Sequence, residues 1–338
     1  MTRYSRQERF KPIGEQGQHK IRASHVLIVG AGALGTAAAS TLVRSGIGTL
    51  TLVDGDFVEL HNLQRQQLFT EQDADDHRAK VKAAAERLRQ INSSVLIHEA
   101  FAELNAANVD EHIQNVDVIV DATDNFATRM LINDAARKNR IPWVYGGVSG
   151  SYGVSMPFYP DQSPCFRCLS PYIGEDEDCD TNGVLATGIQ IVAAHQATQV
   201  LRMLVGDVQT PKLYTFDVWK AESSYVAVAK LAMISCETCG PEPSYPALRE
   251  RPREKHIQWM CARTGVQVRP AQALQLDFPD NLNADKWQYK RFPDLSTFRK
   301  DGRQVILFKD GRAMIRGVQD TEEAEAIYDE VVGLTIPS

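Results

Sequence analysis

The stretch HVLIVGAGALGTAAASTLVRSGIGTLTLVD, residues 25–54, constrains the fold most strongly. It predicts a strand at 26–29, a glycine turn, a helix at 34–45 and a second strand. Gly30, Gly32 and Gly35 allow a tight turn and a close approach of a polyphosphate to the helix N-terminus. Free N–H groups and the helix dipole favour negative charge there. The pattern predicts a nucleotide-binding domain, and it leaves NAD, FAD and ATP open as ligands.

Strands and helices alternate along the following residues. Apolar residues recur at helical spacing between 79 and 92, and a long buried helix is expected within 183–204. A strand is expected in 95–101. Another lies in VDVIVDAT, 116–123, whose unbroken apolar run is typical of a strand buried on both faces of a parallel sheet. The sequence therefore predicts an α/β fold with a doubly wound, mostly parallel, Rossmann-like sheet.

Three segments are predicted. Residues 1–240 form the nucleotide-binding domain, and the proline- and charge-rich residues 241–255 form a linker. Residues 256–338 form a small α+β domain with a hairpin in VILFKDGRAMIRGV. Its last helix is expected to be capped by Asp320 and to end at Gly333. The sequence assigns no role to this domain.

The charge and hydropathy patterns exclude several protein classes. The net charge is −6, and acids and bases are interspersed, so the dominant basic face of a nucleic-acid-binding protein is absent. No run reaches the roughly 18 apolar residues of a membrane span. The polar N-terminus has no apolar stretch of a secretory signal. We expect a cytoplasmic protein that binds neither nucleic acid nor membrane.

Charged residues near the glycine loop indicate what it holds. Asp54 follows the second strand, where a ribose hydroxyl is bound in any of the three nucleotides. Arg65 and Lys80 together are candidate phosphate ligands, although either one alone is more typical of a solvated surface charge. Asp124 and Asn125 follow the strand in 116–123, and a carboxylate near phosphates is best explained as a magnesium ligand. A dehydrogenase would need a proton-transfer residue, and none is evident.

The cysteines form two pairs. Cys165 and Cys168 make one CxxC, and Cys236 and Cys239 make another after 67 intervening residues. Four thiolates in two such pairs predict a tetrahedral structural zinc site, with a redox role as the alternative. Cys179 lies in the acidic segment GEDEDCDTNGV, where flanking acids raise a thiol pKa, so a cysteine without special role is one interpretation.

Five motifs together resemble the ThiF/MoeB adenylyltransferases, bacterial relatives of the ubiquitin-activating enzymes. They are RYSRQ, VLIVGAGALG, GIGTLTLVDGDFVELHNLQRQQLF, DATDNFATR and CFRC…CETC, in that order, within residues 1–240. The chain looks most similar to ThiF-type proteins of thiamine thiazole synthesis that carry a C-terminal extension.

The resemblance implies a homodimer that uses ATP and magnesium to adenylate the C-terminal glycine of a ubiquitin-like sulfur-carrier protein ending in Gly-Gly. It implies that Asp54 holds the ribose, Asn62, Arg65 and Lys80 the phosphates, and Asp124 the magnesium. It implies further that Arg6 reaches the partner protomer's site and that Cys179 links to the carrier.

Three other functions remain open. The carrier could be of the ThiS type, which is favoured, or of the MoaD type of molybdopterin synthesis. A NAD-dependent oxidoreductase with a structural zinc is a different class of enzyme. A carrier-binding scaffold without catalysis is a third possibility, and the joint presence of Arg6, Arg65, Lys80 and Asp124 argues against it.

Overall fold

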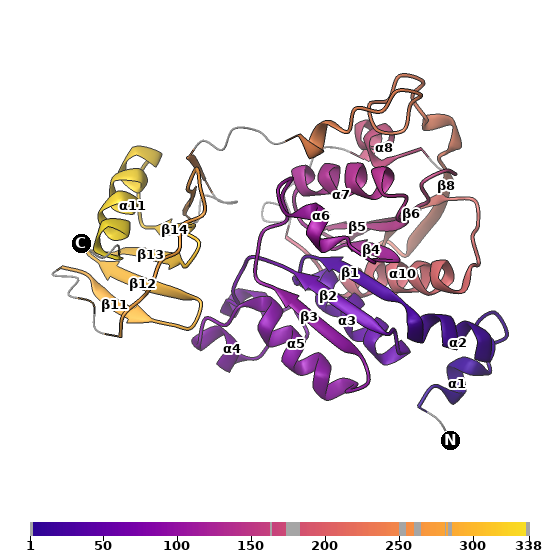
Figure 1. The fold of residues 1–338 in the computed structure, drawn as a ribbon, viewed down its shortest axis with the longest axis horizontal. Helices are drawn as coiled ribbons and strands as arrows, with labels where there is room; N and C mark the ends of the chain where they lie inside the picture. The colour runs from indigo at the N-terminus through magenta and orange to yellow at the C-terminus, as the bar shows by residue number, and fades with distance from the viewer. Residues whose placement is uncertain are drawn as a thin grey trace. The chain divides into compact units, whose positions relative to one another are not determined.

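The chain divides into two compact units, Met1–Glu250 and Arg251–Ser338 (Figure 1). Each unit has a hydrophobic core of its own. The structure is a computed structural model and describes residues 3–162, 164–173, 183–249, 255–259, 265–280, 282 and 286–335. Cys179 lies outside the described residues.

The first unit is built on an eight-stranded sheet with the order β3-β2-β1-β4-β5-β6-β7-β8. Its strands are β1 (His25–Val29), β2 (Thr49–Val53), β3 (Leu96–Ala100), β4 (Val118–Asp121), β5 (Trp143–Ser149), β6 (Tyr152–Phe158), β7 (Lys212–Asp217) and β8 (Glu222–Ala227). Strands β3, β2, β1, β4 and β5 run parallel, and β6, β7 and β8 continue the sheet antiparallel. The predicted α/β fold with a mostly parallel sheet is confirmed.

Helices cover both faces of this sheet. They are α1 (Ser5–Glu8), α2 (Gly14–Ala23), α3 (Ala33–Ser45), α4 (Glu71–Asp75), α5 (Lys80–Ile91), α6 (Val109–His112), α7 (Phe126–Lys138), α8 (Phe166–Ile173) and α10 (Ala186–Val205). Short 3₁₀ helices are η1 (Leu60–Asn62), η2 (Ala229–Leu231) and η3 (Pro246–Leu248). Figure 1 shows α7 and α8 on one face and α3, α5 and α10 on the other.

Strand β1 shows why the sheet is covered twice. Its side chains alternate between faces, as strand geometry requires. Val26 and Ile28 join the core that includes α3, α5 and α10, whereas Leu27 and Val29 join the core that includes α7 and α8. The unbroken apolar pattern in the sequence therefore reflects burial on two sides.

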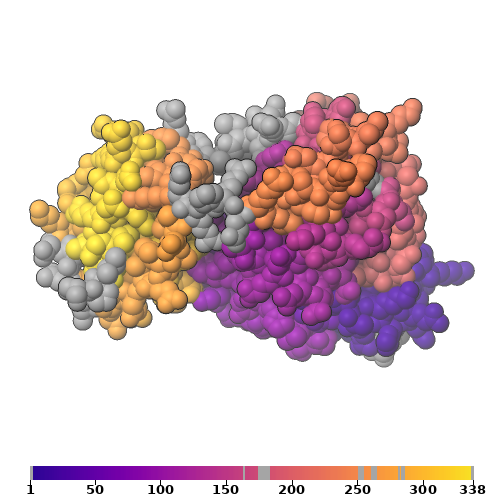
Figure 2. Space-filling model, turned by 45° about the horizontal axis from the view of Figure 1, so that its top comes forward, coloured from indigo at the N-terminus to yellow at the C-terminus, as the bar shows by residue number. Residues whose placement is uncertain are grey.

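The first part of the predicted linker lies on the first unit. Helix η3 packs against α7, where the Ala247 N–H donates to Asp134 Oδ2 over 2.9 Å. In Figure 2 this segment, orange, lies on the magenta surface of the same unit. Residues up to 249 thus extend the first unit beyond the expected boundary at 240.

The second unit is an antiparallel sheet of order β11-β12-β13-β14-β10-β9 with one helix. Its elements are β9 (His256–Trp259), β10 (Val266–Arg269), β11 (Gln288–Arg291), β12 (Leu295–Lys300), β13 (Arg303–Phe308), β14 (Ala313–Arg316) and α11 (Thr321–Thr335). The predicted hairpin is the β13–β14 pair, with Gly311 at φ +84° in its turn.

Helix α11 begins as predicted and ends later than predicted. The Glu323 N–H donates to Asp320 Oδ1 over 2.7 Å, as in an N-terminal cap. The prediction that Gly333 ends the helix is wrong, because α11 continues to Thr335. Val332 and Thr335 are buried on either side of Gly333, so tertiary packing outweighs the low helix propensity of glycine.

In the part of the chain that the structure describes, no helix is both long and apolar enough to cross a membrane.

Candidate functional site

The glycine loop joins β1 to α3. Gly30 has φ +97°, and a Cβ there would lie 2.4 Å from the Ala122 carbonyl oxygen. A Cβ at Gly35 would lie 1.9 Å from the Gly30 carbonyl oxygen. Packing within the protein therefore explains both glycines. At Gly32 the nearest atom to an added Cβ is Gln66 Nε2 at 3.8 Å, an ordinary contact. Gly32 instead leaves the backbone at the start of α3 open to a ligand.

Asp54 stands beside this loop at the carboxyl end of β2. Its Oδ2 accepts a hydrogen bond from the Ala31 N–H (2.6 Å), and its Oδ1 accepts one from the Asp56 N–H (2.7 Å). Burial raises the pKa of Asp54, and the nearby Lys80 opposes that rise. Each carboxylate oxygen can accept more than one hydrogen bond, so Asp54 can also accept a ribose hydroxyl.

Lys80 is buried in an ion pair. Its side chain is 10% exposed, and its Nζ lies 2.9 Å from Asp56 Oδ2. Burial alone would lower the pKa of Lys80, but the carboxylates of Asp56, Asp54 and Asp124 outweigh it and raise that pKa. The ammonium is therefore charged at neutral pH. Sequence reasoning missed Asp56, whose only signal was an acid two residues after Asp54.

Asp124 and Asn125 follow β4 at the same edge of the sheet. Asp124 is exposed to solvent. Partial desolvation by the nearby protein, with the Asp56 carboxylate acting in the same direction, raises the pKa of Asp124. Asn125 caps α7, because its Oδ1 accepts a hydrogen bond from the Thr128 N–H over 2.8 Å. The structure thus gives Asn125 a structural task in addition to any contact with nucleotide.

The predicted phosphate residues between β2 and α5 differ in how they are held. Asn62 is buried, and its Oδ1 accepts a hydrogen bond from the Glu59 N–H over 3.0 Å. Arg65 is half-buried, and its Nη1 donates to the His61 carbonyl over 3.0 Å. Gln66, to which the sequence pattern assigned no role, is buried, and its Oε1 has no hydrogen-bond partner among the described residues.

A pair of backbone hydrogen bonds joins the two ends of the loop between β2 and α5. The Val58 N–H donates to the Arg78 carbonyl (2.8 Å), and the Lys80 N–H donates to the Asp56 carbonyl (2.9 Å). An antiparallel bridge joins Phe57 to Ala79 between them. The start of α5 is thereby fixed against the residues that follow β2.

Arg6 lies away from these residues of its own chain. It is exposed on α1, and its neighbours anchor the arm: Asn92 Nδ2 donates to the Tyr4 hydroxyl (2.8 Å), and Gln7 Nε2 donates to the Ser45 carbonyl (2.9 Å). Ser45 ends α3, whereas the glycine loop begins it. A helix of this length spans about 20 Å, so the arm is attached at the opposite end of α3.

The four predicted metal ligands converge. The Sγ atoms of Cys165, Cys168, Cys236 and Cys239 all lie within 4.8 Å of one another. Two cross-pair distances, Cys165–Cys236 and Cys168–Cys239, are 3.5 Å. Four sulfurs at the usual 2.3 Å from a tetrahedral zinc would be about 3.8 Å apart, so the cluster has the size of a Cys₄ metal site.

The surroundings of the cluster suit thiolates. The Met233 N–H donates to Cys168 Sγ and the Thr238 N–H to Cys236 Sγ, both over 3.4 Å. Such N–H···S bonds stabilise negative charge on sulfur. Without a cation, hydrogen bonding by the Cys165 thiol lowers the pKa of Cys239 to about 5, and Cys239 in turn raises the pKa of Cys165. One thiol of the pair thus keeps its proton while the other loses it. All four sulfurs can be thiolates together only if a cation neutralises their charge.

Helix α7 supports both cysteine pairs. Asp134, fully buried, accepts hydrogen bonds from the Thr238 hydroxyl (2.5 Å) and Arg167 Nη2 (3.2 Å). Asn133 Oδ1 accepts one from the Phe166 N–H over 2.7 Å. The cluster thus ties the end of the first unit back to its middle.

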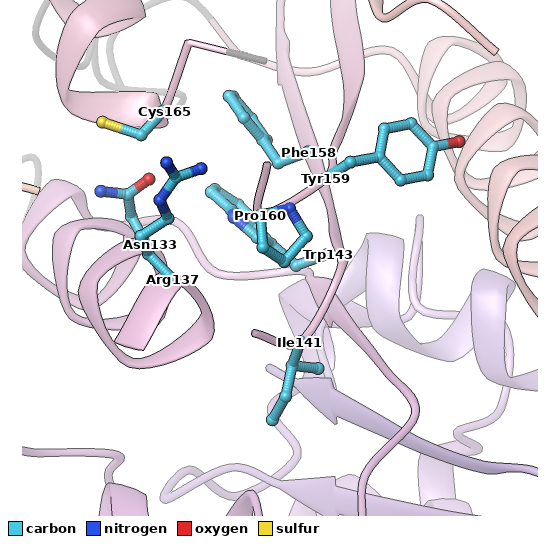
Figure 3. A pocket seen from close by; sticks show the side chains of 8 residues that line it. All are labelled: Asn133, Arg137, Ile141, Trp143, Phe158, Tyr159, Pro160 and Cys165. Carbon is cyan, nitrogen blue, oxygen red and sulfur yellow. The ribbon is translucent and has the colours of Figure 1, made fainter. Parts of the chain in front are cut away.

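A small cavity of about 10 Å³ lies beside Cys165, between Asn133 and Arg137 of α7 and the rings of Trp143 and Phe158 (Figure 3). This volume suits at most one water molecule. It is too small for a nucleotide, and no predicted phosphate residue lines it.

Comparison with known proteins decides the family. The ThiF family model matches residues 4–238. The chain belongs to the ThiF family. The predicted family membership is confirmed.

Two relatives with the same name match this chain over different lengths. The chain is 40% identical over 335 residues to the sulfur carrier protein ThiS adenylyltransferase of Bacillus subtilis, covering 98% of this chain and 99% of that protein. The Escherichia coli protein of the same name is 36% identical and covers 72% of this chain and 97% of its own length. The match to the Bacillus protein extends through the second unit.

Solved structures support the fold. The E. coli MccB structure with ATP superposes with a TM-score of 0.60 at 22% identity, covering 70% of this chain and 74% of that chain. At this identity the likeness concerns the fold alone.

Proposed function

We propose that this protein adenylates the C-terminal carboxylate of a ubiquitin-like sulfur-carrier protein ending in Gly-Gly, with ATP as the second substrate. The observation that carries the proposal is Gly32, whose missing side chain serves no packing need, at the start of a helix flanked by Asp54 and Lys80. The names of the two relatives, one matching nearly end to end, favour a ThiS-type carrier over a MoaD-type carrier.

The chemistry needs no nucleophile from the protein. An oxygen of the carrier carboxylate attacks the α-phosphorus of ATP, and the bond from that phosphorus to the bridging oxygen of pyrophosphate breaks. An acyl-adenylate and pyrophosphate result. The charged Lys80, with Arg65, stabilises the negative charge that develops on the phosphate oxygens. The N–H groups at the start of α3 hold the phosphates, and Asp54 holds the ribose.

Asp124 is the proposed magnesium ligand. Asp54, Asp56 and Asp124 surround the single ammonium of Lys80, so the carboxylates outnumber it and favour a further cation. Hard divalent cations prefer such oxygen ligands. Bound magnesium would neutralise charge on the phosphates.

The proposed homodimer follows from the position of Arg6. The arm that carries Arg6 is anchored through Gln7 about one helix length from the glycine loop of its own chain. Its proposed task at a phosphate site is therefore carried out in the site of a partner subunit.

The four-cysteine cluster is proposed to hold a structural zinc. All four positions of a tetrahedral ion are taken by protein sulfur, which leaves none for substrate. Cys179 remains a proposal from family resemblance, as the residue that links to the carrier after adenylation.

Exchange of labelled pyrophosphate into ATP tests the function. We expect exchange only with ATP, magnesium and a ThiS-type carrier, and no exchange with the same carrier shortened by its Gly-Gly end. A MoaD-type carrier is the specificity control. Reduction of NAD in place of exchange would support the oxidoreductase alternative. A folded protein that binds the carrier without exchange would support the scaffold alternative.

A further inference from the structure

Asp56 joins the two ends of the nucleotide site. Its N–H donates to Asp54 Oδ1 over 2.7 Å, and its carbonyl accepts from the Lys80 N–H over 2.9 Å. Its Oδ2 accepts from Lys80 Nζ over 2.9 Å. One residue therefore contacts both the proposed ribose ligand and the proposed phosphate ligand, 26 positions apart in the chain.

The side-chain contact restricts a group that is otherwise hard to fix. Lysine has a flexible stem and three N–H donors. The side chain of Lys80 is only 10% exposed, and a buried ammonium without a partner would be strongly unfavourable. Asp56 takes one donor and leaves two for phosphate oxygens.

We propose that Asp56 is a positioning residue, which holds the Lys80 ammonium in place and links it to Asp54 so that ribose and phosphates are bound in one fixed frame. This inference rests on the proposed adenylation. Asp56 does not itself attract the nucleotide, because a carboxylate near a triphosphate repels it. Its contribution is therefore expected in the rate of reaction and not in the affinity for ATP.

Asp56→Asn is the direct test, since asparagine keeps the shape and the backbone contacts but removes the charge. In carrier-dependent adenylation we expect kcat to fall roughly 100-fold, the cost of misplacing a catalytic group, while KM for ATP stays within about threefold. Asp161→Asn is the matched control, because Asp161 is an exposed acid paired with Arg140. Melting temperatures establish that both variants are folded.

A double-mutant cycle isolates the link to Lys80. In the Lys80→Met background, Asp56→Asn should change kcat less than about twofold further, because its target is gone. An equal loss in both backgrounds, an unchanged kcat in the single variant, or an effect confined to KM would each overturn the inference.

Amine labelling gives a readout that does not depend on activity. Acetylation followed by mass spectrometry should show Lys80 protected in the wild type relative to Lys82, which is exposed on the same helix. Asp56→Asn should raise the Lys80/Lys82 labelling ratio severalfold. An unchanged ratio contradicts the inference, whereas the expected ratio in a protein without pyrophosphate exchange contradicts only the proposed function.

Discussion

The three glycines of the nucleotide loop differ in what surrounds them. An added Cβ at Gly30 or Gly35 would clash with a carbonyl oxygen of the protein, whereas an added Cβ at Gly32 would make only an ordinary contact with Gln66. We therefore expect folding and nucleotide binding to depend on different glycines of this motif.

Alanine substitutions should separate these roles. Gly35→Ala places a Cβ against the Gly30 carbonyl, so we expect a loss of about 1–3 kcal/mol or more in the free energy of unfolding. Gly32→Ala should leave the melting temperature unchanged and weaken ATP binding at least about tenfold, because the methyl group occupies space near the phosphates. Thermal melts and calorimetric ATP titrations measure the two effects. Equal losses of stability would contradict the distinction.

We expect Asp124 to contribute to the reaction more than to folding, because it is exposed to solvent and its proposed partner is a cation. Asp124→Asn should lower kcat for adenylation roughly 100-fold with little change in melting temperature. Raising the magnesium concentration should restore part of the rate. A folded Asp124→Asn variant with wild-type turnover at low magnesium would remove the residue from the metal site.

Helix α7 performs two tasks at its two ends. Asn125 caps its start near the nucleotide site, and Asn133 and Asp134 hold the cysteine pairs further along. The four-cysteine cluster and the proposed nucleotide site are therefore both attached to α7.

Removal of the metal should loosen the cysteine segment. We expect one zinc per chain by elemental analysis, and Cys168→Ser combined with Cys239→Ser should abolish zinc binding and lower the melting temperature. Chelation of the wild type should have the same effect, and added zinc should reverse it. A metal-free wild type of unchanged stability would contradict the structural role.

Helix α11 offers a stabilising substitution. Gly333 lies within the helix, is exposed, and has no atom within 4 Å of an added Cβ. Gly333→Ala should stabilise the second unit by about 0.5–1 kcal/mol by reducing the freedom of the unfolded chain. Calorimetry of the full chain should show a higher transition for that unit. Gly317→Ala is the contrasting variant and should destabilise, because Gly317 has φ +79° and its Cβ would lie 2.5 Å from the Gly302 carbonyl oxygen.

The proposed homodimer can be tested by mixing inactive subunits. In a heterodimer of Arg6→Ala with Lys80→Ala, one site carries both substitutions and the other carries neither. Random mixing should therefore restore about one quarter of wild-type activity, since half of the dimers have one intact site of two. Arg3→Ala in place of Arg6→Ala is a control for the arm, because Arg3 bonds its own chain at the Ile91 carbonyl. No recovery in demonstrably mixed dimers would refute action in trans.

Local patterns predicted much of the first unit. The glycine loop, Asp54 and the strand before Asp124 each depend on neighbours in sequence, so periodicity and spacing located them. The Asp56–Lys80 pair depends on the bridge from Phe57 to Ala79, and the bond from Gln196 Nε2 to the Asp121 carbonyl spans 75 residues. Such contacts arise only when the chain is folded, and no local pattern specifies them. The strand order of the second unit could not be predicted for the same reason, because β10 pairs with β14, which is distant in sequence.

The closed base of the loop between β2 and α5 has a consequence for how this site can change. The backbone hydrogen bonds from Val58 to Arg78 and from Lys80 to Asp56 hold the two ends of this loop together. They involve only main-chain atoms, so they do not depend on the side chains within the loop. Within residues 59–77, Leu68, Phe69 and Ala74 belong to the hydrophobic core, so we expect substitutions to be tolerated at exposed positions such as Gln64 while Asp54, Asp56 and Lys80 keep their places. The proposed phosphate contact of Arg65 can thus change during evolution without displacing the proposed ribose contact of Asp54.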